Sequence, residues 1–190
     1  MRKKFYTVAW SIIALCFVGM YFLTKDDPKP DADKTEQVKK SDTKKASSSE
    51  NEQTSFESDI KKLGVFDAVE YNAENDAFII SEDINATFGD KKAIEYFNSD
   101  IRQILDKGLH SDKPVAFRAW DGKNAASIVY FTTDKFNQDW KSENLLDSDT
   151  YTKSSGWMSM SKFGQYQSAN DKADDNAIAE KIFNIFQLSK

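Results

Sequence analysis

Residues 115–131 read VAFRAWDGKNAASIVYF, and this stretch decides the kind of fold that the chain adopts. Two runs rich in aromatic and β-branched residues, Val115–Trp120 and Ala125–Phe131, flank the dipeptide Asp121-Gly122. Such a dipeptide between two such runs favours a β-hairpin, because glycine adopts the positive φ that tight hairpin turns require. The stretch therefore predicts two antiparallel strands and a sheet against which the rest of the domain packs.

A second hairpin is predicted upstream of the first. Val65–Tyr71 alternates its side chains in the manner of a strand, and Ala77–Ser81 returns as another apolar run. The intervening residues 72–76 read NAEND. A run of asparagine, glutamate and aspartate is typical of a turn. We therefore expect two hairpins in one sheet.

Helical periodicity follows each hairpin. Asp90 is placed to cap a helix that runs to Lys107, with apolar residues recurring every three or four positions. Asp171 is placed to cap a final helix, with Asp174 and Asp175 in its first turn, where carboxylates favour the helix dipole. Short helices are also expected at 56–63 and within 134–146, whereas 151–166 stays open between a strand and an aromatic-lined loop.

This order of elements predicts an α+β domain over residues 56–190. Two consecutive hairpins form an antiparallel sheet, and the helices cover one of its faces. The domain holds 16 lysine and arginine residues against 23 aspartate and glutamate residues, a formal charge of −7. An acidic surface repels nucleic acid, so we expect no nucleic-acid partner.

The apolar opening of the chain predicts where this domain resides. Residues 5–23 read FYTVAWSIIALCFVGMYFL and contain no charge. A helix rises about 1.5 Å per residue, so this run can cross a hydrocarbon core of about 30 Å. The predicted anchor covers residues 1–24, and its membrane-facing side chains are Phe5, Trp10, Ile12, Ile13, Leu15, Phe17, Val18, Phe22 and Leu23. Arg2, Lys3 and Lys4 favour a cytoplasmic N-terminus, which places the bulk of the chain outside the membrane as a single-pass protein.

Two alternatives to an uncleaved anchor stay open. Cys16, the only cysteine, would be lipidated in a lipoprotein, but the bulky Leu15 stands where such signals carry a small residue. A cleaved signal peptide would need small residues before the cut, and the end of the apolar run offers no such pair. Residues 25–55 then form a linker rich in lysine, aspartate and serine, for which we expect disorder.

Few residues indicate catalysis or metal binding. His110 is the only histidine and Cys16 lies in the predicted anchor, so we expect neither a metal site nor a cofactor. Three Ser-x-x-Lys matches begin at Ser41, Ser58 and Ser159, a frequency that a chain rich in serine and lysine produces by chance. We assign no catalytic residue. Paired carboxylates leave a hydrolase of cell-wall material or peptides as the alternative function.

The leading candidate for a binding surface is aromatic. Trp157 follows Ser154-Ser155-Gly156, a run that suggests an exposed turn, and Phe163 and Tyr166 lie close by in sequence. These three side chains could dock a protein partner. Core packing of the tryptophans is the competing interpretation.

The layout resembles the small membrane-anchored and lipoprotein-like envelope proteins of low-GC Gram-positive bacteria. The resemblance rests on RKKFYTVAWSIIALCFVGMYFLTK at residues 2–25, the linker, and the two hairpins VEYNAENDAFIIS and FRAWDGKNAASIVYF. It implies a location at the cell membrane. We therefore expect a non-catalytic envelope protein whose outer domain binds a protein partner at the cell surface.

Overall fold

The computed structural model describes residues 55–190. The predicted anchor, its alternatives and nearly all of the predicted linker lie outside the described residues. Within 55–190, no helix is both long enough and apolar enough to cross a bilayer.

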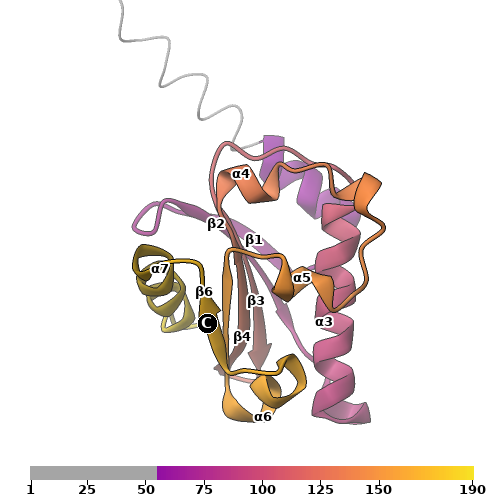
Figure 1. The fold of residues 1–190 in the computed structure, drawn as a ribbon, viewed down its shortest axis with the longest axis vertical. Coiled ribbons are helices and arrows are strands. Elements are labelled where there is room, and N and C mark those ends of the chain that lie inside the picture. The colour runs from indigo at the N-terminus through magenta and orange to yellow at the C-terminus, as the bar shows by residue number, and fades with distance from the viewer. Residues whose placement is uncertain (1–54) are drawn as a thin grey trace, which may run out of the picture. The chain divides into compact units, whose positions relative to one another are not determined.

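The centre of the domain is a six-stranded sheet whose strands lie in chain order (Figure 1). The first hairpin becomes β1 and β2, the second becomes β3 and β4, and two shorter strands complete the sheet. Their bounds are β1 Ala68–Asn72, β2 Ala77–Asp83, β3 Val115–Asp121, β4 Asn124–Phe131, β5 Gly156–Ser159 and β6 Asp171–Ala173. Both predicted hairpins are confirmed, and Gly122 has the positive φ of 63° that its turn requires.

The prediction of a purely antiparallel sheet is wrong, because β2 and β3 pair in parallel. The helix α3, Asp90–Leu105, lies between these strands in sequence and returns the chain to the end at which β2 begins. A long crossover of this kind makes neighbouring strands parallel, whereas a tight turn makes them antiparallel. The α+β class holds, with a mixed sheet.

One face of the sheet packs against α3 in a core of aromatic and aliphatic side chains. The apolar stripe predicted for α3 is the buried one, formed by Ala93, Ile94, Phe97, Ile101, Ile104 and Leu105. Helical residues 55–63 add Phe56 and Ile60 to the same core. The ring of Phe56 lies 4.5 Å from that of Phe78 between centroids, so this short helix is packed onto β2.

The opposite face packs against α7, Asn176–Phe186, through Ile182 and Ile185. The prediction that helices cover only one face is therefore wrong, as Figure 1 shows with α3 and α7 on either side of the sheet. Asp175, not Asp171, caps this helix, and its side chain accepts from the Ile178 amide at 2.8 Å. Asp171 instead begins β6, because the backbone of residues 171–173 pairs with β5.

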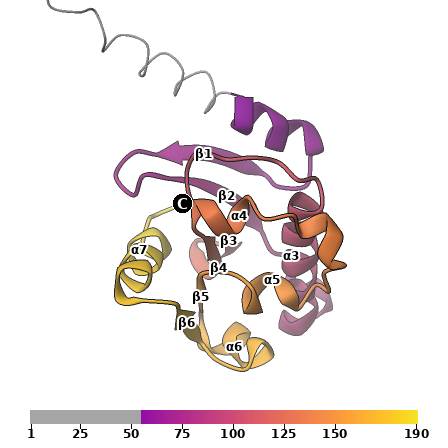
Figure 2. The same cartoon turned by 45° about the horizontal axis from the view of Figure 1, so that its top comes forward.

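Short helices connect the larger elements over the α3 face (Figure 2). The predicted helix within 134–146 is two pieces, and the indole of Trp140 donates to the Phe136 carbonyl at 3.0 Å to join them. The segment left open at 151–166 contains both strand and helix. The bounds are η1 Ala86–Phe88, α4 Thr133–Phe136, η2 Trp140–Glu143, α5 Asp149–Thr152, α6 Ser161–Gly164 and η3 Gln165–Gln167.

Candidate functional site

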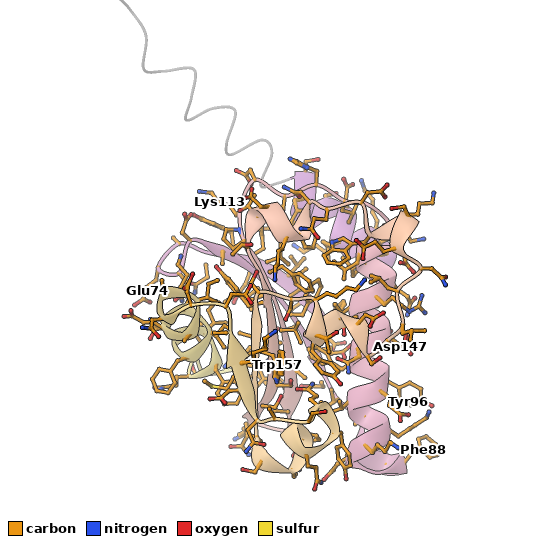
Figure 3. All side chains as sticks on the ribbon, in the orientation of Figure 1. Glu74, Phe88, Tyr96, Lys113, Asp147 and Trp157 are labelled. Carbon is orange, nitrogen blue, oxygen red and sulfur yellow. The ribbon has the colours of Figure 1, made fainter. Side chains whose placement is uncertain are left out.

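The three aromatic residues expected to form a docking surface do not share one. Trp157 is 6% exposed and Phe163 is fully buried, whereas Tyr166 is 39% exposed. Trp157, which Figure 3 labels, packs edge-on against Tyr151 with 5.3 Å between ring centroids, inside the α3-side core. The expected exposure of Trp157 is wrong because Gly156 starts an interior strand, where β4 and β6 flank β5 on either side.

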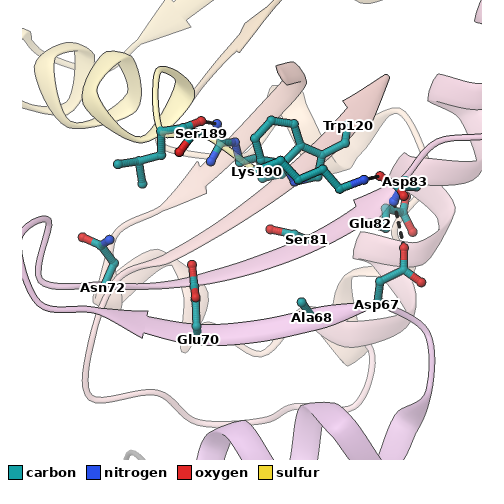
Figure 4. Close-up of a pocket in the computed structure, with 12 residues that line it drawn as sticks. Asp67, Ala68, Glu70, Asn72, Ser81, Glu82, Asp83, Trp120, Ser189 and Lys190 are labelled. Atoms are coloured by element: carbon teal, nitrogen blue, oxygen red, sulfur yellow. Dashed lines mark hydrogen bonds and ion pairs between the residues drawn. The ribbon is translucent and has the colours of Figure 1, made fainter. Parts of the chain in front are cut away.

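The structure offers a different candidate, a groove on the face that carries α7. This helix packs mainly over β3 to β6 and also covers Ala77 and Ile79 on β2, so the same face is left open only on β1 and at the end of β2. Ala68 and Glu70 on β1 are exposed there. The groove encloses about 470 Å³ between strands β1, β2 and β3 and residues 188–190 (Figure 4). We refer to it as the open-face groove.

Strand alternation determines which side chains enter the open-face groove. Side chains two residues apart lie on the same face of a strand, and paired residues on neighbouring strands share that face. Ala68, Ser81 and Arg118 are such cross-strand neighbours. The groove therefore collects Ala68 and Glu70 from β1, Ser81 and Asp83 from β2, and Arg118 and Trp120 from β3.

Arg118 lies at the floor of the groove and is only 3% exposed. Its guanidinium carbon lies 3.9 Å from the centroid of the Trp120 ring, a cation–π contact. Its Nη2 donates to the carbonyls of Phe186, at 3.0 Å, and of Leu188. Burial lowers the pKa of Arg118 to about 10, so the group stays charged at neutral pH. Arg118 thus ties the residues after α7 to the sheet.

Arg118 also keeps donor capacity that this contact does not use. Its buried Nε has no hydrogen-bond partner among residues 55–190. The carboxylate of Glu70 is near enough to favour the charged guanidinium, although burial outweighs this effect on the Arg118 pKa. No ion pair joins these two side chains within the described part of the chain, so Glu70 presents a free carboxylate to the groove.

The far end of the groove holds the side chain of Lys190. Its ammonium pairs with the carboxylate of Asp83, lies 3.4 Å from the Gly122 carbonyl and 5.9 Å from the Trp120 ring centroid. The Asp83 amide in turn donates to the Asp67 carboxylate at 2.8 Å. These contacts close the groove at the ends of β2 and β3.

The acid with the most strongly shifted pKa points away from this groove. Alternation along β2 turns the Glu82 carboxyl toward α3, where it shares a hydrogen bond with Asp100. Burial and then the Asp100 charge raise the pKa of Glu82 to about 8, and burial also raises the pKa of Asp100. The pair therefore holds a proton at neutral pH. Its place between β2 and α3 makes it part of the packing.

No family model, curated protein or solved structure matches this chain. The arrangement of its own residues thus carries the functional argument. Among residues 55–190, no three histidine, cysteine, aspartate or glutamate side chains are grouped to hold a metal ion.

Sequence reasoning missed the residues of the open-face groove. One signal was present, since Arg118 is the only charged residue within the apolar run Val115–Trp120. A charge in the middle of a buried strand needs a partner or a function. The contribution of Lys190 had no comparable signal, because it lies 107 residues from Asp83 in the chain.

Proposed function

We propose that this protein is a membrane-anchored, extracytoplasmic envelope protein whose domain at 56–190 binds a protein partner without catalysing a reaction. The open-face groove carries the proposal. Its volume of about 470 Å³ lies in the range of ligand-binding clefts, about 300–1,000 Å³. Its walls combine an aromatic ring with a few charged groups, the composition that such clefts use to orient a ligand.

The shape of the groove favours an extended segment of the partner. The groove runs over the face of β1, β2 and β3, and the small side chain of Ala68 does not obstruct it on β1. Strand addition at the edge of β1 is less favourable, because Glu57 already accepts from the Tyr71 amide at 3.2 Å. The partner segment therefore crosses the sheet face instead of extending the sheet.

A hydrolase is the weaker alternative. It would need an acid that holds a proton and a second carboxylate facing it across a groove. Glu82 and Asp100 hold such a proton, yet they meet between β2 and α3, on the face opposite the groove. This separation is the reason we favour binding.

Membrane anchoring rests on the uncharged run at residues 5–23 and on the basic residues before it. Protease added to intact cells should remove the 56–190 domain, and the mature chain should retain residues 1–24. A mature N-terminus beyond Leu23, or full protection of the domain from protease, would refute the anchor.

Site-specific crosslinking tests the groove. A photoreactive amino acid replaces Ala68 inside the groove, or Lys141 on η2 as the control, in the full-length protein on intact cells. Both positions are exposed, and η2 lies on the face that carries α3. We expect a discrete crosslinked protein from position 68 and none from position 141. Equal products from both positions, or none from position 68, would contradict the proposal.

A further inference from the structure

The side chain of Lys190 shows which chemistry the end of the open-face groove accepts. The Asp83 carboxylate, the Gly122 carbonyl and the Trp120 ring surround its ammonium. Carboxylates and carbonyls accept hydrogen bonds from an ammonium, and an aromatic face attracts a cation. We call these three groups the cation seat.

Lys190 is held in the cation seat only weakly. Its side chain is 41% exposed and that of Asp83 is 57% exposed. Ion pairs as exposed as this one shift an equilibrium by about fivefold at most. Arg118 fixes the chain through the carbonyls of Phe186 and Leu188, four and two residues before Lys190. The Lys190 side chain can therefore leave the seat while the rest of the tail stays in place.

The charges of the groove favour a cation over an anion. Its carboxylates are those of Asp67, Glu70 and Asp83, and its cations are Arg118 and Lys190. Glu82 does not count toward this balance, because its carboxyl group is turned to α3. One negative charge is in excess with Lys190 seated, and two are in excess once Lys190 leaves. Arg118 is engaged with the tail, whereas Glu70 has no ion-pair partner among residues 55–190.

We propose that the cation seat binds a lysine or arginine side chain of an extended partner segment, and that Lys190 occupies the seat when no partner is bound. The inference rests on the binding function proposed above and names the chemistry of the partner. The partner segment crosses β1 beside Glu70 and inserts its cation between Asp83 and Trp120. The tail thus competes with the partner for one site.

Synthetic peptides test this competition directly. Three acetylated and amidated peptides with the sequence Gly-Thr-Val-X-Val-Thr-Gly carry lysine, norleucine or glutamate at X. Each is titrated calorimetrically, at low salt, into the full-length protein in mild detergent. We expect the lysine peptide to bind more tightly than the other two, because only it fills the cation seat.

Three variants locate the interaction. Asp83→Asn should weaken binding of the lysine peptide by about fivefold and leave the norleucine peptide unchanged. Lys190→Ala should raise the affinity for the lysine peptide by up to about fivefold, because it removes the competing side chain. Lys172→Ala is the matched control, since Lys172 lies 5.5 Å from the Trp157 ring at the other side of the sheet. Lys172→Ala should leave the affinities for the lysine and norleucine peptides unchanged.

The possible negative results distinguish a failure of the cation seat from a failure of the proposed binding function. Equal binding of the lysine and norleucine peptides would overturn the cation seat and leave a groove that binds peptides. Preference for the glutamate peptide would assign recognition to Arg118 instead. If none of the peptides bound either the wild type or Lys190→Ala, the cation seat would also be overturned. The crosslink from position 68 tests the open-face groove independently of this result. Lys190→Ala removes only an exposed side chain, so its result stands even if Asp83→Asn disturbs folding.

Discussion

The carboxyl pair of Glu82 and Asp100 makes the stability of the domain depend on pH. The Glu82 pKa is about 8 in the folded protein against 4.5 for the unperturbed group. Between these values the folded state holds a proton that the unfolded chain has lost, so the free energy of unfolding falls as pH rises. Stability is therefore greatest below about pH 4.5 as far as this group is concerned, and its contribution is lost as pH passes about 8.

The size of the effect follows from the displacement of the pKa. Each unit by which the pKa is shifted corresponds to about 1.4 kcal/mol in the free energy of unfolding. The upper limit for Glu82 is therefore about 5 kcal/mol. Glu82 is only partly buried, and solvent screening reduces that limit, so we expect a loss of about 2–3 kcal/mol. Glu82→Gln should abolish the dependence, because an amide resembles the protonated acid and can still donate to Asp100.

Urea unfolding of the full-length protein in mild detergent, followed by near-ultraviolet circular dichroism from pH 5 to 8.5, measures the effect. Glu82→Gln should match the wild type at pH 5 and exceed it by about 2–3 kcal/mol at pH 8.5. Glu74→Gln is the control, because Glu74 is exposed in the β1–β2 turn. A wild-type stability that stays constant over this range, or a Glu82→Gln variant that is weaker at every pH, would refute the reasoning.

Five further substitutions, two of them as comparisons, test the packing by thermal or urea unfolding. Trp157→Ala should destabilise the domain by about 3–5 kcal/mol, whereas Tyr166→Ala should change stability by less than about 1 kcal/mol; similar values would contradict the burial of Trp157. Asp175→Ala should cost about 1 kcal/mol through the lost cap of α7, and Asp171→Ala should cost less; the reverse order would restore the cap predicted from sequence. Gly156→Ala should cost about 1–3 kcal/mol, because its Cβ would lie 2.5 Å from the Lys172 carbonyl oxygen and 2.7 Å from Ile182 Cδ1; unchanged stability would contradict this close packing of β5 against β6 and α7.

Local signals predicted the elements more accurately than they predicted the arrangement of the sheet. The turn at Asp121-Gly122 and the helix near Asp90 follow from neighbouring residues, and both occur, although Gly89 is the N-cap of this helix and Asp90 is its first residue instead of the predicted cap. The aspartate cap of the last helix was assigned four residues too early, because Asp171 and Asp175 both precede a helical pattern. Only the pairing of residues 171–173 with β5 distinguishes them.

The candidate site depended on contacts that no local window contains. Trp157 follows serine and glycine residues of the kind that exposed turns often contain, yet its strand lies between β4 and β6. Arg118 showed itself as a charge in an apolar run, but its acceptors lie 68 and 70 residues further along the chain. The open-face groove exists only because α7 covers one part of a sheet face and leaves another part open.

By itself, the sequence determined the two hairpins, the helices that follow them, the acidic charge of the domain and an uncharged run long enough to cross a membrane. Those features depend on turn chemistry, side-chain periodicity and composition, which act over a few residues or over the chain as a sum. The tertiary structure decided the parallel pairing of β2 with β3, the burial of Trp157 and the meeting of Arg118, Asp83 and Lys190. Such contacts join distant residues, and the packing of the whole domain selects them, because loop closure must be offset by burial that only the complete fold provides.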